Sequence, residues 1–238
     1  MRRDHRPPWL KRLYVGYQNF YVNRYLRPQF EHLGGGYIFM QPWHVEVFGP
    51  LVHLGDNISI MASSDGKVRF TVWSDRDDLS GIHIGDACVI NPGVRISAAR
   101  EIVIGQSTML ASGVYITDTD WHGLYDRVGP GPVSPVRLGD NVWVGDGAMV
   151  GKGVTIGDNS IIGARSLVLH DVPANVIAGG NPARVIRELD PETPIRTRAD
   201  WFAASGLTQD LQAIDDALLK DNSFLHWLRT LISPRRGD

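Results

Sequence analysis

The sequence predicts an all-β solenoid in which short parallel strands stack as three-sided coils. Its main evidence is a six-residue phrase: an aliphatic residue, usually Gly, two polar residues, a small residue and one more. A spacing of six cannot form one face of an α-helix, where the apolar stripe needs a period of 3.6 residues. Three such phrases make one coil, because each aliphatic residue can point inward and the following Gly permits a tight corner. The aliphatic positions are Ile84, Ile90, Ile96, Ile104, Leu110, Ile116, Leu138, Val144, Val150, Ile156, Ile162 and Val168.

Residues 1–45 lack the repeat and are rich in arginine and aromatic residues. A solenoid exposes its end strands unless something covers them, so we interpret this segment as a helix that caps the first coil or packs on a neighbouring subunit. A second hypothesis is a membrane-surface helix, because basic and interfacial aromatic residues suit anionic lipid. The basic residues are Arg2, Arg3, Arg6, Lys11 and Arg12, and the apolar face comprises Trp9, Leu10, Leu13, Tyr14, Tyr17, Phe20, Tyr21 and Tyr25.

A weaker form of the repeat begins near residue 46, so the β-helical domain is predicted to span residues 46–189. The inward residues of its first part are predicted to be Phe48, Leu54, Ile60 and Val68. The phrase slips by two residues before Val68 and again before Ile104, which predicts a bulge at one corner of each coil.

The repeat stops between Trp121 and Arg137, where Gly and Pro are abundant. This composition predicts an excursion loop over residues 122–137 that leaves the solenoid. Such loops commonly carry functional residues.

Residues 190–238 lose the repeat and gain helical periodicity between residues 211 and 231. We expect a C-terminal tail of two short helices packed on the β-helix, with contact to a partner or membrane as the alternative.

The composition of the chain argues against several classes of function. The formal net charge of −2 gives no electrostatic argument for nucleic-acid binding. No apolar run is long enough to span a membrane and no secretory signal is recognisable, so a cytoplasmic enzyme, with peripheral contact to the inner face of the membrane as a further hypothesis, is expected. Cys88 occupies a small-residue slot of its phrase, which predicts buried packing rather than a nucleophile.

The stretch from Leu138 to Leu189 includes NVWVGDGAMVGKGVTIGDNSIIGARSLVLHDVPANVIAGGNPARVIREL. It resembles the end of the galactoside and maltose O-acetyltransferase branch of the hexapeptide-repeat acyltransferases. The resemblance implies a left-handed parallel β-helix, acetyl-CoA as the acyl donor and a homotrimer. It also implies acetyl transfer to a hydroxyl of a sugar or glycan precursor.

The resembled enzymes place their catalytic histidine where the chain leaves the coil, which corresponds to His122 in TDTDWHGLYDR. Transfer from a thioester to a hydroxyl needs a base with a pKa near the working pH, and histidine suits that role. A carboxylate can fix the imidazole tautomer, so Asp118, Asp120 and Asp126 are candidate supporting residues by proximity. Direct attack without an acyl-enzyme is expected.

The same resemblance implies further site residues. Asn91 matches an acceptor-binding asparagine, while a corner-turning role before Pro92 is an equal alternative. Trp143 would pack on the pantetheine arm of coenzyme A, and the amide of Asp146 would approach the thioester oxygen. Ala164 occupies a matching corner, and Arg184 and Arg187 would bind the phosphates of the donor.

Three other functions compete with O-acetylation. The same base and donor groove would serve N-acyl transfer to an amino sugar or other amine. A scaffold that retains the β-helix without activity is a hypothesis from another class. Zinc-dependent carbonic anhydrases of the γ type share the β-helix, but they need three converging histidines, and His83 and His122 are far apart in sequence. We therefore expect no metal.

Overall fold

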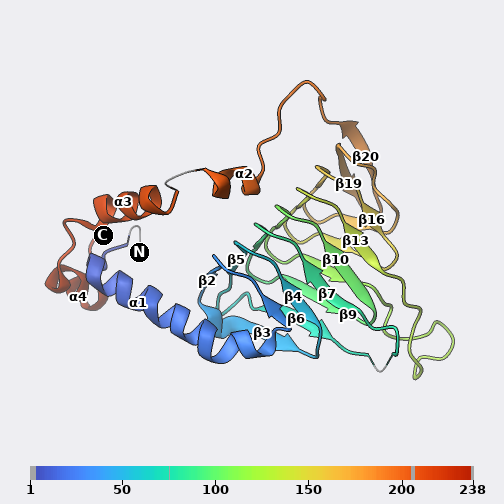
Figure 1. Cartoon of the computed structure of the whole chain (residues 1–238), viewed down its shortest axis with the longest axis horizontal. Helices are drawn as coiled ribbons and strands as arrows, with labels where there is room; N and C mark the ends of the chain where they lie inside the picture. Colours follow the sequence, from blue (N-terminus) through green and yellow to red (C-terminus); the bar gives the residue numbers. More distant parts are fainter. Residues whose placement is uncertain (1–3, 75, 205–206, 237–238) are drawn as a thin grey trace.

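The structure, a computed structural model, describes residues 4–74, 76–204 and 207–236. It is a left-handed parallel β-helix with helical appendages, which confirms the predicted fold class (Figure 1). Three parallel sheets form the faces of the solenoid, and successive strands step from sheet A to sheet B to sheet C and back to sheet A. The solenoid tapers in Figure 1 from a wide end at β3 to a narrow end at β20.

Strand bounds follow the repeat. Sheet A contains β1 (His32–Leu33), β4 (Val52–Leu54), β7 (Gly81–Ile84), β10 (Glu101–Ile104), β13 (Val136–Leu138) and β16 (Thr155–Ile156). Sheet B contains β2 (Ile38–Met40), β5 (Ser59–Met61), β8 (Val89–Ile90), β11 (Met109–Leu110), β14 (Trp143–Val144), β17 (Ile161–Ile162), β19 (Val176–Gly180) and β20 (Ala183–Glu188). Sheet C contains β3 (Val45–Phe48), β6 (Val68–Val72), β9 (Arg95–Ala98), β12 (Tyr115–Thr117), β15 (Met149–Val150) and β18 (Leu167–Val168). Only β20 pairs antiparallel among these, through its ladder with β19.

The core is the column of aliphatic side chains that the repeat predicts. Every position from Ile84 to Val168 named for the repeat is buried, and so are Leu54, Ile60 and Val68. Phe48 was predicted to point inward but is 57% exposed. Val45, three residues earlier, is the buried residue of that strand, because β3 pairs with β6 in the register Val45 to Val68.

The solenoid begins earlier than the predicted residue 46. Strands β1 and β2 pair with β4 and β5, so a complete coil precedes β4. The signal was present in the sequence, since Leu33, Phe39 and Val45 keep the six-residue spacing and are all buried. It was missed because residues 1–45 are rich in arginine and aromatic residues, which led us to assign the whole segment to the cap.

The N-terminal segment forms α1 (Pro8–Tyr21), a π-helical turn (Val22–Leu26) and a 3₁₀ turn (Arg27–Gln29). Val22, Leu26 and Phe30 are buried in the core cluster and so cover the wide end of the solenoid. Helix α1 projects beyond that end (Figure 1). Its base packs on Trp43 of a second 3₁₀ turn (Pro42–His44), where the rings of Tyr14, Tyr17 and Tyr21 lie about 6 Å from the indole.

The tail turns back along the solenoid, and its described residues form three helices where two were predicted: α2 (Arg198–Ala203), α3 (Leu207–Leu219) and α4 (Phe224–Ile232). Helix α2 is attached to the solenoid, because Arg198 donates hydrogen bonds to the Ala87 carbonyl at 2.8 Å and to Ser59 Oγ at 3.0 Å. Helices α3 and α4 instead join α1 in a helical arm, which we define as residues 4–21 with α3 and α4 (Figure 1). Lys11 pairs with Asp215 at 2.6 Å within this arm.

Candidate active site

The chain leaves the solenoid at the corner between sheets C and A. One excursion follows β6 and ends before β7, and a longer one follows β12 and ends before β13. A cleft of about 1010 Å³ lies between these excursions. Its lining residues are Trp73, Ser74, Arg76, Ala99, Thr119, Trp121, His122, Val128, Pro130, Gly131 and Val133.

His122 is exposed and lines this cleft. Its place is set by the backbone of the loop. Trp121 adopts a left-handed conformation with φ of 63°, and its amide donates to Thr119 Oγ1 at 3.1 Å. Gly131 lies against the His122 backbone, where a Cβ atom would meet the His122 carbonyl oxygen at 2.5 Å. Only glycine permits that close approach, so the two arms of the loop meet behind His122.

The three candidate supporting carboxylates have partners other than His122. Asp118 is buried and accepts hydrogen bonds from the amides of Ala99, Arg100 and Glu101 at 2.7 to 2.8 Å. Burial raises the pKa of Asp118, although the three amide hydrogen bonds act in the opposite direction. Asp120 pairs with Lys152 at 2.6 Å, and Asp126 accepts from the amides of Val128 and Gly129. Asp118 therefore stabilises the corner of the solenoid, and Asp126 stabilises the loop.

The predicted donor residues gather on another side of the solenoid. Trp143 projects from sheet B and is 47% exposed. Asp146 and Ala164 lie in the turns that lead from sheet B to sheet C on neighbouring coils. Both residues are exposed, and neither amide nitrogen makes a hydrogen bond within the described part of the chain. Arg184 and Arg187 follow on β20 at the narrow end of sheet B.

Asn91 also lies at the corner between sheets B and C, in the turn from β8 to β9. Its side-chain Nδ2 donates to the Leu110 carbonyl of the next coil at 2.9 Å. The structure therefore brings Asn91, Asp146 and Ala164 to one corner and places His122 at a different one. A single chain does not unite the predicted base with the predicted donor residues.

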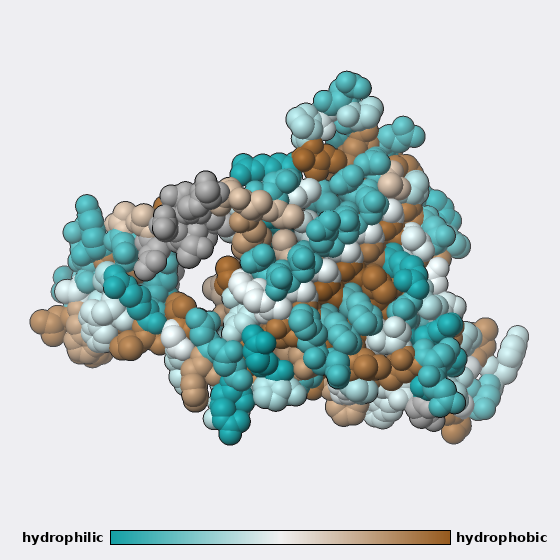
Figure 2. Space-filling model, viewed as in Figure 1, coloured by the Kyte–Doolittle hydropathy of each residue, from teal (hydrophilic) through white to brown (hydrophobic). Residues whose placement is uncertain are grey.

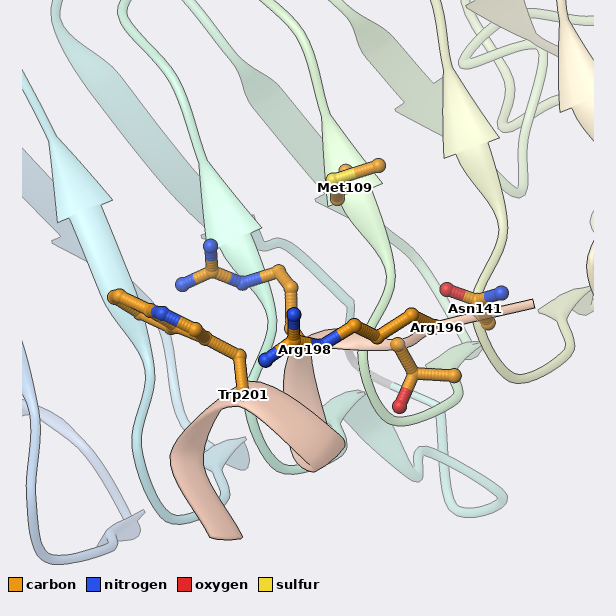
Figure 3. A pocket seen from close by; sticks show the side chains of 6 residues that line it. Met109, Asn141, Arg196, Arg198 and Trp201 are labelled. Atoms are coloured by element: carbon orange, nitrogen blue, oxygen red, sulfur yellow. The ribbon is translucent and has the colours of Figure 1, made fainter. Parts of the chain in front are cut away.

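The sequence did not predict that the tail lines a cavity beside the solenoid. A cavity of about 320 Å³ lies beside sheet B, between Met109 and Asn141 of the solenoid and residues 196–198 and 201 of the tail. Figure 3 shows Arg196 and Arg198 extending from the tail toward Trp201, with Met109 projecting from β11. Met109 pairs with Trp143 in the sheet register, so this cavity adjoins the predicted donor residues. The tail could not be placed from the sequence because its contacts join residues far apart in the chain.

Histidines outside the cleft line sheet A. His32, His53 and His83 occupy aligned positions on β1, β4 and β7. His122 does not belong to this row. Within residues 4–74, 76–204 and 207–236, no group of three or more His, Cys, Asp or Glu side chains is arranged to hold a metal ion. Over the same ranges, no helix has both the length and the hydrophobicity needed to cross a bilayer.

The repeats of this chain are similar to those of known transferases. Residues 135–170 match the family described as bacterial transferase hexapeptide (six repeats). Galactoside O-acetyltransferase of Escherichia coli is 40% identical over 113 residues, which cover 47% of this chain and 56% of that protein. A putative lipopolysaccharide biosynthesis O-acetyltransferase, WbbJ of Escherichia coli, is 32% identical over 130 residues, covering 50% and 66%.

Curated relatives are matched over only part of their length, and the chain spans 57% of the putative acetyltransferase YJL218W of Saccharomyces cerevisiae. Among solved structures, AntD, an N-acyltransferase from Bacillus cereus in complex with dTDP and 3-hydroxybutyryl-CoA, aligns with a TM-score of 0.59. The alignment covers 81% of this chain and 96% of AntD at 15% identity, which shows a shared fold. The chain thus carries the repeats of the bacterial hexapeptide transferases on a left-handed β-helix, and the predicted resemblance to the hexapeptide-repeat acyltransferases is confirmed.

Proposed function

We propose that the protein is an acetyl-CoA-dependent O-acetyltransferase that acetylates a hydroxyl of a sugar or glycan precursor. The observation that carries the proposal is the position of His122, exposed in a cleft of about 1010 Å³ where the chain leaves the solenoid. A histidine there is accessible to an acceptor, and histidine is the side chain that most often serves as a general base.

The donor would lie along sheet B and its corner with sheet C. The groups present fit such a ligand, because Trp143 offers an exposed apolar surface and the amides of the exposed Asp146 and Ala164 have no partner within the described residues. Arg184 and Arg187 supply guanidinium groups for phosphates at the narrow end. When bound, acetyl-CoA supplies a thioester whose carbonyl carbon is the electrophile.

The reaction needs one base and one hydrogen-bond donor from the protein. A ring nitrogen of His122 takes the proton of the acceptor hydroxyl as its oxygen attacks the acetyl carbon. The Asp146 amide donates to the carbonyl oxygen as negative charge develops there. His122 then returns the proton to the departing sulfur, so the C–S bond is replaced by a C–O bond and the imidazole is neutral again.

The acceptor would occupy the cleft beside His122. Trp73 lines that cleft with 68% of its surface exposed, and its ring lies 5.5 Å from the Phe48 ring. A flat indole suits the apolar face of a sugar ring, while polar groups nearby can bind its hydroxyls. This placement favours a carbohydrate acceptor. Asp120 stays a candidate for orienting His122 only if an acceptor or a neighbouring copy displaces Lys152.

A complete site would require a second copy of the chain. His122 lies at the corner between sheets C and A, whereas the proposed donor residues line sheet B and the corner between sheets B and C. A cyclic homotrimer joins unlike corners of neighbouring copies around a closed ring. We therefore include a trimer in the proposal, with His122 of one copy facing the donor residues of the next.

The proposal is tested by measuring free-thiol release from acetyl-CoA with paired hydroxyl and amino sugars. Release by the wild type should require an acceptor, and His122→Ala should lower kcat by roughly 10² to 10⁴ with little effect on donor affinity. His170→Ala, at an exposed position outside the cleft, is the matched control. Release with amino sugars alone would establish N-acyl transfer instead, and absence of both release and CoA binding would favour a scaffold.

A further inference from the structure

Two guanidinium groups from the tail share the cavity between α2 and sheet B, which we call the tail cavity. Arg196 and Arg198 are the charged residues among those that line it. Figure 3 shows both side chains extending toward the Trp201 indole. Two like charges in a space of about 320 Å³ repel each other, and an anion bound between them would remove that repulsion.

Arg198 is a half-buried cation whose contacts in the described part of the chain are with neutral groups. Its guanidinium donates to the Ala87 carbonyl and to Ser59 Oγ, and it lies 5.6 Å from the centroid of the Trp201 ring. Burial lowers the pKa of Arg198, and the opposing contribution comes from Cys88 instead of a carboxylate. A guanidinium has five N–H donors, so Arg198 keeps donors for an anionic ligand.

Arg196 is exposed, and its side chain makes no hydrogen bond or ion pair within residues 4–74, 76–204 and 207–236. Asp200 is close enough for Arg196 to help lower its pKa, but its carboxylate accepts from the amide and the hydroxyl of Thr197 at 2.8 Å. Asp86 and Asp140, at the corner between sheets A and B, accept backbone amides of adjacent coils at 2.7 and 2.9 Å. The carboxylates of this region therefore have other partners.

The two tail arginines differ from the basic residues of the N-terminal segment that suggested a membrane-surface helix. Ion pairs join Arg6 to Asp4, Lys11 to Asp215 and Arg12 to Asp216. Arg2 and Arg3 lie outside the described residues. Carboxylates compensate the cations of the helical arm, whereas no acidic residue of the described chain lines the tail cavity.

The charge of the tail cavity suits a phosphate group. A phosphate monoester carries about −1.5 to −2 at pH 7 and so balances two guanidinium groups, whereas one carboxylate balances only one. Guanidinium forks also match the geometry of phosphate oxygens. Helix α2 lies against the side of the solenoid in Figure 1, and Figure 2 shows hydrophilic residues beside it. A polar surrounding of this kind suits a charged ligand that arrives from water.

The tail cavity has room for more than a phosphate group. Its volume is at the lower end of the range of about 300 to 1,000 Å³ that is usual for small-molecule sites. Met109 and Trp201 give it apolar walls, and an indole beside a guanidinium is a surface on which a nucleobase can stack. A nucleoside monophosphate combines such a planar ring with a doubly charged phosphate.

We propose that the tail cavity binds a nucleoside monophosphate. Its phosphate would lie between the Arg196 and Arg198 guanidinium groups, and its base would lie against Trp201 and Met109. The ligand would bridge the tail and the solenoid, because Met109 belongs to β11 and the other three residues belong to the tail. The inference does not depend on acetyl transfer.

This site is separate from the one proposed for the phosphates of the acyl donor. Sheet B places four strand spacings between β11, which carries Met109, and β20, which carries Arg184 and Arg187. At about 4.8 Å for each spacing, the two places are about 19 Å apart. A variant at one place should therefore leave binding at the other unchanged.

The test is isothermal titration calorimetry of the full chain with AMP and with ribose 5-phosphate. The wild type should bind one AMP per chain, about tenfold or more tightly than ribose 5-phosphate, because only AMP carries a base that can stack. Arg196→Gln should weaken the binding of both ligands at least about tenfold, because it removes a charge-assisted contact with the phosphate. Arg127→Gln, at an exposed position of the excursion loop, should bind both ligands as the wild type does.

Two further variants test the other wall and the separation from the donor site. Trp201→Leu should remove the advantage of AMP over ribose 5-phosphate while leaving the affinity for ribose 5-phosphate within about twofold. Arg187→Gln should leave AMP binding unchanged. Circular dichroism and the thermal midpoint of Arg196→Gln without ligand should match the wild type, since the Arg196 side chain makes no hydrogen bond in the described chain.

Three results would overturn the proposal. The first is no binding of AMP by the wild type at millimolar concentration. The second is equal affinity for AMP and ribose 5-phosphate, which would exclude a role for the base. The third is normal AMP binding in Arg196→Gln, and if Arg187→Gln then loses it, the AMP lies at the donor site.

Discussion

His53 and His83 stack on neighbouring strands of sheet A, with ring centroids 4.5 Å apart and ring planes 9° from parallel. Burial, followed by the charge of His83, lowers the pKa of His53, and His32 on the preceding strand acts in the same direction. Glu31 opposes the shift. The folded chain therefore holds a proton at His53 less readily than the unfolded chain does.

This pair predicts a loss of stability in mild acid. Because the pKa of His53 is lower in the folded state, its contribution is complete above the unfolded value of about 6.5 and is lost as the pH falls below it. Urea denaturation between pH 8 and pH 5 should show the decline. His83→Gln removes the like charge and should flatten the decline, whereas His170→Gln, at an exposed site, should leave it unchanged. An identical decline in His83→Gln would contradict the assignment.

Mixing two inactive variants tests whether the site is shared between copies. His122→Ala lacks the proposed base, and Ala164→Glu places a bulky anion at the proposed donor corner. In a cyclic trimer assembled at random from equal amounts, each site draws its base and its corner from different copies, so about a quarter of the sites are intact. Co-refolded protein should recover about that share of wild-type turnover. Recovery of none, with both variants trimeric, would place the whole site in one chain.

Removing the indole of Trp73 should weaken acceptor binding without slowing chemistry. We expect Trp73→Ala to raise the acceptor KM about tenfold, with kcat within about twofold, because loss of an aromatic contact costs about 1 kcal/mol or more. The KM for acetyl-CoA should stay the same. Trp9→Ala is the control, since Trp9 lies on the helical arm. A Trp73→Ala variant with unchanged acceptor KM would remove Trp73 from the acceptor site.

Asp118 and Asp120 should differ sharply in their effect on stability. Asp118→Ala leaves the Ala99, Arg100 and Glu101 amides without their acceptor, which should lower the free energy of unfolding by about 2–4 kcal/mol. Asp120→Ala removes a partly exposed ion pair and should cost no more than about 1 kcal/mol. Chemical denaturation measures both. Equal losses would mean that the corner does not depend on the Asp118 carboxylate.

The coils could be predicted because the local sequence pattern determines their register. An inward aliphatic residue at about every sixth position specifies the core without knowledge of any distant residue, and every repeat position from Ile84 to Val168 is buried. Phe48 failed because hydrophobicity alone does not say which face of a strand a residue occupies, and its partner Thr71 on β6 is what settles the register.

The site was predictable in part. The resemblance indicated His122, and the sequence located the loop that carries it. The wall of the cleft that Trp73 forms could not be predicted, because Trp73 belongs to a separate excursion at the same corner of the solenoid. No local sequence pattern predicted the path of the tail. Arg198 reaches Ser59 and Ala87, and Ala199 donates to Ser107 Oγ, so the contacts bridge segments whose pairing only the folded solenoid creates.

The returning tail limits the number of coils that the solenoid can contain. Repeat proteins ordinarily gain or lose a coil at little cost, because each coil contacts only its neighbours. Here the chain runs from β20 back past α2 to α1, so it is fastened at both ends of the stack. One added coil would lengthen the stack by about 4.8 Å, which an extended tail could match only by gaining one or two residues. The coil count and the tail length must therefore change together if both attachments of the tail are to be kept.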